Sequence, residues 1–356
     1  MTRSPRGLPS GRTRVRFAAL LPALLLAACA TAPDRAIRPI ESRLLPGYPA
    51  YFSADVAGNR ALLAYVLGAL EVDQDRLLGR TDRITGGLRF DIGGPPTAFA
   101  IASGSFPRSG AQMGLTLDRS VARQTATIDG ARRVYFVERT DSGGRDAGGD
   151  AGAAGGDRGD ANALQIALPE SGIVYIAIGS TRGVAARAPL IETMLADRSP
   201  AELSIAPDVF ERLTAVGSPG RPLATIVLTD PGAGFLSALG VDAPFLPITT
   251  VALSVAGAPG ADRGVAVAGT GPLLLSGDLV FRNERDAALF ARVGRVFVVL
   301  LVRALGLDAA SAQAQTRIAV SGTSVEFSGI PMTPEELVAV IRSLARPGRP
   351  TDGGAR

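Results

Sequence analysis

The chain contains no histidine, no lysine and no tryptophan, and its 356 residues include a single cysteine, Cys29. Without histidine, neither a Ser-His-Asp triad nor a Cys-His pair can form. Without lysine, the chain lacks a P-loop, which ends in Gly-Lys-Ser/Thr, and it lacks a Schiff base or a Ser-x-x-Lys nucleophile. Zinc sites built from histidines and cysteines are excluded as well. The chemistry that is left would use carboxylates, tyrosine, arginine, or Ca²⁺ and Mg²⁺ held by oxygen atoms.

The only cysteine stands directly after an apolar run. Residues 1–16 carry five arginines and no acidic residue, and residues 17–28 read FAALLPALLLAA. A positive segment followed by a short apolar segment and small residues is typical of an export signal. The apolar run is too short to span a bilayer, which needs about 20 apolar residues. We therefore expect residues 1–28 to be a cleaved signal peptide.

The end of this signal has the pattern of a lipidation site. Leu26, Ala27, Ala28 and Cys29 resemble the lipobox of bacterial lipoproteins, in which an apolar residue and two small residues precede the cysteine. The resemblance implies that Cys29 becomes the mature N-terminus and carries a diacylglyceryl thioether and an N-acyl chain such as palmitate. Two or three acyl chains anchor a protein stably, because each buried CH₂ contributes about 0.8 kcal/mol. The alternative is an ordinary signal peptide that a cysteine happens to follow.

The resemblance also predicts where the protein resides. The membrane is a partner through the N-terminal lipid, and the residue after Cys29 is Ala30 rather than aspartate. In the enterobacterial sorting pattern, this position without aspartate implies the outer membrane. We expect a lipid-anchored protein of the cell envelope that faces the periplasm or the cell surface.

The charge of the mature chain argues against a nucleic-acid partner. The full sequence has 37 basic and 33 acidic residues, and the five signal arginines leave 32 basic residues, a balance of −1. A nucleic-acid-binding domain would show a clear basic excess. A single lipidated cysteine forms no internal disulfide, so a core drawn from the 46% hydrophobic residues must stabilise the fold.

The pattern of the mature chain predicts an α+β fold. Residues 29–45 are expected to form a lipid-anchored tether, and residues 347–356 a disordered tail. Between them the order of strand, helix, two or three strands, helix, hairpin and helix occurs twice, which predicts two pseudo-repeats at 46–200 and 201–346. Each would be a mainly antiparallel sheet with helices packed on one face. Residues 141–162, rich in glycine and aspartate, are expected to be a disordered insertion in the first repeat.

Individual elements follow from β-branched content, turn signals and caps. Strands are expected at 50–56, 83–90, 97–104, 133–139, 163–169, 172–179, 224–230, 249–257, 264–271, 273–281, 316–322 and 324–329. Helices are expected at 59–70, 108–117, 181–197, 232–240, 283–306 and 333–346.

The helix that begins near Asn283 is apolar enough to raise the question of whether it contacts a membrane. Its most apolar piece, residues 296–302, is far shorter than a bilayer span and lies between two arginines. At about 100° per residue, Arg285, Arg292 and Arg303 form a narrow polar stripe on an otherwise apolar helix. We expect this helix to pack deeply between the sheet and a neighbouring element, with the stripe in water. The alternative, a helix lying in the membrane interface, would show a broad basic face.

No residue outside the lipobox is predicted to be catalytic, metal-binding or cofactor-binding. Residues 232–237 (GAGFLS) lack the third glycine of a dinucleotide fingerprint, and residues 321–329 (SGTSVEFSG) lack a base, so both are interpreted as turns. Asp82, near Arg80 and Arg83, and the acidic residues after Asn283 are typical of turns and helix caps. The aspartates of residues 141–162 lack the period of a Ca²⁺ repeat.

These absences favour a non-catalytic binding or scaffolding protein, and in general organisation the chain resembles periplasmic lipoproteins that repeat such units. Its partner would be an envelope protein or an apolar ligand. The alternative is a carboxylate-dependent hydrolase of envelope polymers, which predicts two acids converging with raised pKa values. A structural role would instead predict a large exposed apolar patch or a free sheet edge.

Overall fold

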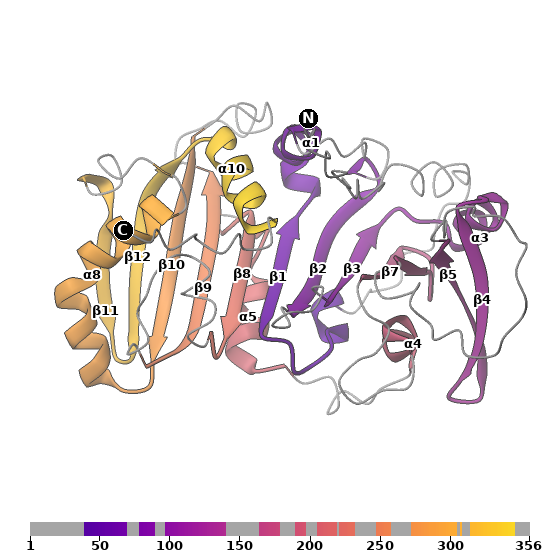
Figure 1. The fold of residues 1–356 in the computed structure, drawn as a ribbon, viewed down its shortest axis with the longest axis horizontal. Coiled ribbons are helices and arrows are strands. Elements are labelled where there is room, and N and C mark those ends of the chain that lie inside the picture. Colours follow the sequence, from indigo (N-terminus) through magenta and orange to yellow (C-terminus); the bar gives the residue numbers. More distant parts are fainter. Residues whose placement is uncertain are drawn as a thin grey trace, which may run out of the picture.

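In the part of the chain that the structure describes, twelve strands form one antiparallel sheet in the order β11-β12-β10-β9-β8-β1-β2-β3-β7-β6-β5-β4 (Figure 1). The computed structural model describes residues 39–69, 78–89, 97–139, 164–178, 189–196, 205–218, 221–231, 247–257, 272–304, 307 and 314–345. The strands are β1 Ala50–Asp55, β2 Thr81–Arg89, β3 Thr97–Gly104, β4 Val121–Ile128, β5 Ala131–Glu138, β6 Gln165–Ala167, β7 Ile173–Ile178, β8 Ala224–Thr229, β9 Ile248–Gly257, β10 Leu273–Phe281, β11 Arg317–Ser321 and β12 Ser324–Met332. The helices are α1 Arg60–Ala69, α3 Arg108–Leu117, α4 Leu190–Leu195, α5 Pro207–Thr214, α8 Glu284–Ala304 and α10 Pro334–Ala345, with the 3₁₀ turns η2 Ile40–Arg43 and η3 Ala57–Asn59.

The predicted α+β class with a mainly antiparallel sheet is confirmed. The sheet runs without a break across residue 200, because β1 pairs antiparallel with β8, with Phe52 opposite Ile226. The strands expected at 97–104 and 273–281 coincide with β3 and β10. The strand expected at 264–271 and the helix expected at 232–240 lie outside the described residues.

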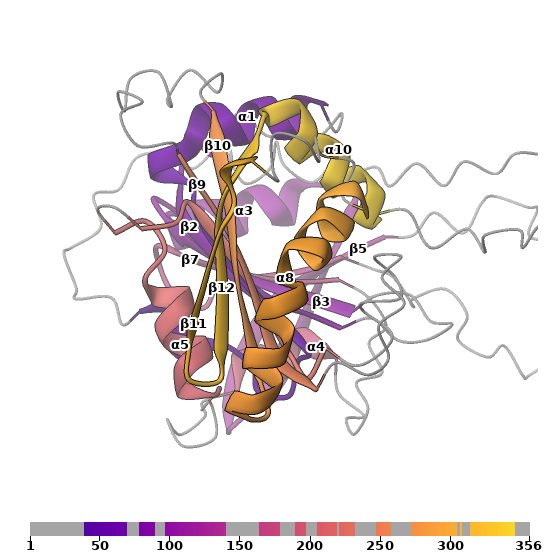
Figure 2. The same ribbon diagram turned by 90° about the vertical axis from the view of Figure 1, so that its left-hand side faces the viewer.

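Helices lie against both faces of the sheet. Neighbouring residues of β8 point to opposite faces: Leu228 belongs to the core cluster that contains α1, α8 and α10, whereas Val227 belongs to the cluster that contains α4 and α5. Figure 2 shows α8 and α5 on opposite sides of the strands β10, β11 and β12. Packing of the helices on one face is therefore not confirmed. The physical reason is that consecutive apolar residues of β8 and β9 make both faces hydrophobic, so both must be covered.

The core beneath α8 is built from phenylalanines. The ring centroids of Phe281 and Phe290, and of Phe290 and Phe297, are 5.0 Å apart. Phe327 of β12 is buried in the same cluster as the α8 rings of Phe290 and Phe297. A Cβ atom on Gly277 of β10 would lie 2.2 Å from the Phe327 ring, so this strand position requires glycine. The cluster fixes the inner side of α8 against the sheet.

The segment before β1 is part of this packing. Leu44 and Leu45 are buried, and the carboxylate of Glu41 lies 2.7 Å from Nε of Arg83 on β2. The guanidinium of Arg83 also donates to the carbonyl of Leu213 at 2.5 Å and to that of Val216 at 3.0 Å. One arginine therefore joins the N-terminal segment, β2 and the C-terminal end of α5, and the packed part of the chain begins before residue 46.

Candidate binding surface

The residues that carry the lipidation prediction lie outside the described part of the chain. This applies to Leu26, Ala27, Ala28 and Cys29, and also to residues 141–162 and 232–237. Two other predicted turns are described. Asn283 caps α8, since its Oδ1 accepts a hydrogen bond from the backbone N–H of Asp286 at 2.9 Å. Residues 321–329 contain the turn between β11 and β12, where Gly322 has φ +58°.

Several carboxylates are bound by arginines from distant parts of the chain. Glu41 binds Arg83, as described above, and Glu170 binds Arg43. Asp82 lies 3.5 Å from Arg60, and both side chains are exposed. These are contacts that hold elements together, and in the described ranges no three acidic or thiol side chains are grouped as a metal site would require.

The least exposed of the remaining acids, Asp278 of β10, is held by two partners. Arg212 of α5 binds one of its oxygens, and the hydroxyl of Ser324 on β12 donates to the other. The three side chains come from three different elements. They tie α5 to the sheet on the face opposite α8.

Two tyrosines with raised pKa values have a similar structural role. Burial raises the pKa of Tyr135 well above its ordinary value, and the hydrogen bond that its hydroxyl donates to Glu192 at 2.7 Å adds to the rise. Burial also raises the pKa of Tyr51, whose hydroxyl donates to the carbonyl of Leu45 at 3.0 Å. Both hydroxyls stay protonated at neutral pH and connect a strand to a neighbouring element.

The outer side of α8 carries a row of exposed apolar side chains. Their spacing of four, three and four residues places them within about 60° of one another around the helix. We call this row the α8 surface: Leu289, Val293, Val296 and Leu300, with exposed fractions of 62%, 54%, 62% and 47%. The expectation that this helix packs deeply between the sheet and a neighbour is wrong for the described structure. Among the α8 side chains that are described, the buried ones lie on its inner side, with Phe290 and Phe297.

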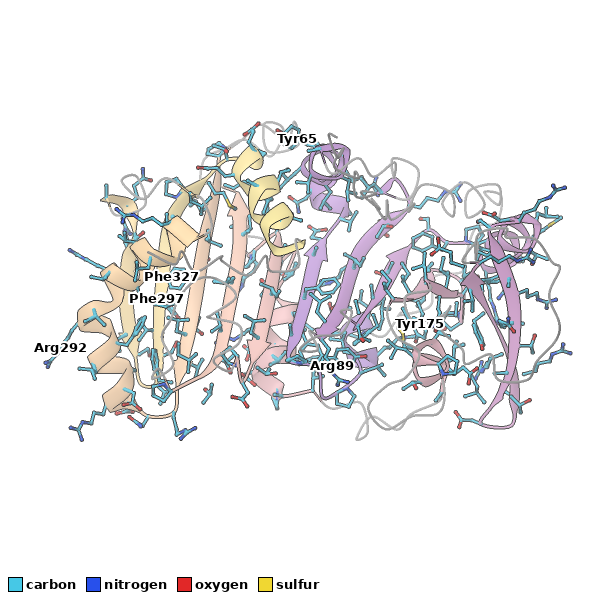
Figure 3. The ribbon with its side chains drawn as sticks, viewed as in Figure 1. Tyr65, Arg89, Tyr175, Arg292, Phe297 and Phe327 are labelled. Carbon is cyan, nitrogen blue, oxygen red and sulfur yellow. The ribbon has the colours of Figure 1, made fainter. Side chains whose placement is uncertain are left out.

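The predicted arginine stripe is confirmed and lies beside the α8 surface. Arg285, Arg292 and Arg303 are all exposed, and Figure 3 shows Arg292 pointing away from the sheet. None of the three forms an ion pair with another described residue. Sequence reasoning identified this stripe but not the apolar row next to it. The signal was present in the spacing of Leu289 and Val296.

An a/d seam of a coiled coil has the same spacing as this row. Apolar residues that alternate at three and four residues form a seam that accepts side chains of a facing helix between its own. In that register Arg285 and Arg292 occupy the g positions, and Phe290 and Phe297 the e positions. Because the e positions are buried against the sheet, only the arginine flank is open to charge contacts with a partner.

Neither α8 nor any other helix in the described ranges is both long and apolar enough to cross a membrane.

Comparison with known proteins identifies a similar fold. No protein-family model matches the sequence. No curated protein matches it. Crystal form I of TP0453 is similar at a TM-score of 0.51 and 15% identity, covering 87% of this chain and 99% of that chain. Crystal form III of TP0453 gives a TM-score of 0.50 at 15% identity, covering 87% of this chain and 100% of that chain. At this identity the likeness shows the fold alone.

Proposed function

We propose that the protein is a lipid-anchored, non-catalytic binding or scaffolding protein of the bacterial envelope, and that it binds another envelope protein through the α8 surface. The single observation that supports this is the exposed apolar row on α8, because contiguous exposed apolar side chains mark interaction sites. Anchoring through acylated Cys29, in the outer membrane, is part of the proposal. The other functions that the sequence leaves open, a hydrolase and a carrier of an apolar ligand, have no comparable observation in the described residues.

The partner that fits the α8 surface is an amphipathic helix with acidic residues along one flank. The seam spacing selects a helix, since a facing helix repeats its apolar residues with the same period. Arg285 and Arg292 select the sign of the charge, because complementary charges across an interface favour encounter and fix register. The partner would lie along α8 with its acids over the two arginines.

The two pseudo-repeats are also a proposal, supported by the strand order. β1, β2 and β3 are followed by α3, and β8, β9 and β10 are followed by α8, with β7 and β12 beside the third strand of each set. Antiparallel pairing of β1 and β8 is the arrangement that a local twofold axis between two repeats would require. α3 and α8 lie on the same face, opposite the α4 and α5 cluster. The proposed boundaries, 46–200 and 201–346, are those that the sequence pattern predicts.

The binding proposal is tested by photo-crosslinking in the intact envelope. The full chain carries p-benzoylphenylalanine in place of Val296 or, as the matched control, in place of Ala288, which is exposed on α8 outside the seam. We expect adducts from position 296 only, and sequencing of the captured peptide should give an apolar heptad pattern flanked by acids. A captured peptide from this chain itself, or adducts with lipid acyl chains, would refute the proposed partner.

The anchor is tested separately by mass spectrometry. The full chain extracted from membranes should carry acyl mass at Cys29, and the Cys29→Ser variant should lose that mass and leave the membrane fraction. An unmodified wild-type cysteine contradicts the lipid anchor and leaves the binding result for α8 to stand alone.

A further inference from the structure

The strand β4 ends the sheet at the side opposite to α8, and no described strand covers its outer edge. It has 8 residues, and all of them pair with β5 in one register without a bulge. Natural edge strands are usually protected from pairing by shortness, proline, bulges or several charges. β4 has none of these features, since its sequence VARQTATI contains no proline and one charge, Arg123. At the other end of the sheet, β11 has only 5 residues.

The backbone groups that β4 presents at this edge can be identified. The N–H of Arg139 donates to the carbonyl of Ser120 at 2.8 Å, so Ser120 and Arg139 are a hydrogen-bonded pair. Antiparallel pairs alternate between hydrogen-bonded and non-hydrogen-bonded. Every second residue of β4 therefore directs its N–H and C=O away from β5. These outward residues are Val121, Arg123, Thr125 and Thr127.

The side chains around the edge are basic and apolar. Arg123 and Arg132 share one face, because Arg132 pairs with Thr127 and residues 123 and 127 lie on the same side of β4. Both are exposed, and neither forms an ion pair with a described residue. On the same face α3 packs against β4, and its last residue, Leu117, is 69% exposed.

We infer that the β4 edge is a second docking site, independent of the α8 surface, that binds an extended acidic segment of another protein by strand addition. Main-chain hydrogen bonds to the outward groups would supply affinity, and side chains at alternate positions would supply specificity. An acid opposite Arg123 would meet a guanidinium that no described carboxylate binds, and an apolar residue opposite Val121 would lie near Leu117. A second copy of this chain fits poorly, because antiparallel pairing of two β4 strands would bring the arginines of both copies together.

The probe is the short peptide acetyl-Glu-Thr-Val-Thr-Glu-Thr-Leu-amide, labelled with a fluorophore and titrated with the full chain in mild detergent. In antiparallel register its leucine lies opposite Val121, its second glutamate opposite Arg123 and its valine opposite Thr125. One control peptide has lysine in place of both glutamates. The other is N-methylated at the valine, which removes one hydrogen bond to the edge and keeps the charge. We expect the acidic peptide to bind at least about tenfold more tightly than either control.

Two variants of the protein separate the backbone from the charge. Thr125→Pro removes an outward N–H, and no β4–β5 hydrogen bond is lost because that N–H points away from β5. Its matched control, Thr125→Val, keeps the N–H. We expect Thr125→Pro to lower the affinity for the acidic peptide at least about tenfold. Thr125→Val should keep that affinity within about twofold of the wild-type value. The exposed Arg123→Glu should reverse the preference between the acidic and lysine peptides.

Several results would overturn the inference. They are equal binding of the acidic and lysine peptides, equal binding of the N-methylated peptide, and unchanged affinity in Thr125→Pro. A wild-type dimer that Thr125→Pro converts to a monomer would also overturn it, because the occupant of the edge would then be a second copy. None of these outcomes depends on the partner of the α8 surface, so they leave the proposed function to its own test.

Discussion

The two ends of the sheet expose different parts of the polypeptide. At the β11 end the helix α8 satisfies its own backbone hydrogen bonds and exposes apolar side chains. At the β4 end the strand exposes backbone donors and acceptors between polar side chains. A helix surface can therefore recognise a partner only through side-chain shape and flanking charge. A strand edge recognises any extended backbone, so the nearby arginines must supply selectivity.

A packed hydrophobic core lies beneath each of the two surfaces. Substitutions in one core therefore test whether the two surfaces are independent. Phe327 lies under α8, and Phe136 of β5 lies next to β4; both are at most 2% exposed. If the two ends are independent, a substitution in the core beneath one surface will leave binding at the other surface unchanged.

The largest effect is expected from removing these rings. Phe327→Ala and Phe136→Ala should each lower the free energy of unfolding by about 3–5 kcal/mol, because the buried area is lost and a cavity remains. Urea titration of the full chain gives the two values. Phe327→Ala should reduce crosslinking at position 296, and Phe136→Ala should lower the affinity of the β4 edge for the acidic peptide. The two ends are not independent if either variant lowers crosslinking at position 296 and peptide affinity to the same extent.

The next largest effect is expected at the junction between the ends. Arg83→Met leaves the buried carboxylate of Glu41 without its partner and removes two hydrogen bonds from the end of α5. Loss of a partner from a fully buried pair costs about 3–5 kcal/mol, and the partial exposure of Arg83 reduces the expected cost to about 2–3 kcal/mol. Urea titration measures it, with Arg60→Met at the exposed pair with Asp82 as the matched control. A cost for Arg83→Met no larger than that of the control would show that Arg83 does not join the halves.

Much of this arrangement follows from the sequence. β-branched runs bounded by turns predicted β3 and β10 at their observed residues, the helix expected at 108–117 coincides with α3, and the cap residue Asn283 predicted the start of α8. β4 was missed because Arg123, Gln124 and Thr125 make it polar, as expected of an exposed edge. The Asp-Gly turn that joins it to β5, with φ +50° and +74°, was a usable hairpin signal.

The remaining features depend on contacts between distant residues. Pairing of β1 with β8 joins residues such as Phe52 and Ile226, and no local pattern encodes that choice. α8 was expected to be covered because a helix that is apolar on most sides is usually buried. Which side the sheet leaves open is decided by the packing of Phe290 and Phe297. Local periodicity therefore predicts the elements, and the surfaces arise only when the elements are assembled.

A smaller effect on stability is expected when the α8 surface itself is changed. Val293→Gln with Val296→Gln removes exposed apolar area only, so the free energy of unfolding should change by no more than about 0.5 kcal/mol per residue. Crosslinking from p-benzoylphenylalanine at Leu289 should nevertheless fall severalfold in this double variant, because two positions of the seam are lost. The matched control places glutamine at Ala288 and should keep both properties. A large loss of stability in the double variant would mean that these valines belong to the core.

The smallest effect is expected above the β1–β8 junction, where α1 contacts α10. The hydroxyl of Tyr65 donates to Glu335 at 2.9 Å. Hydrogen bonds from the backbone N–H of Glu335 and then from Tyr65 lower the pKa of this carboxyl below its ordinary value. A lowered pKa in the folded state contributes stability above the ordinary pKa, and the contribution disappears as the pH falls through the lowered value. Tyr65→Phe should therefore raise the pKa of Glu335 toward its ordinary value, as measured by NMR titration, so that the stabilisation from this carboxylate is lost at a higher pH on acidification. An unchanged pKa would show that this hydrogen bond between α1 and α10 is not maintained in solution.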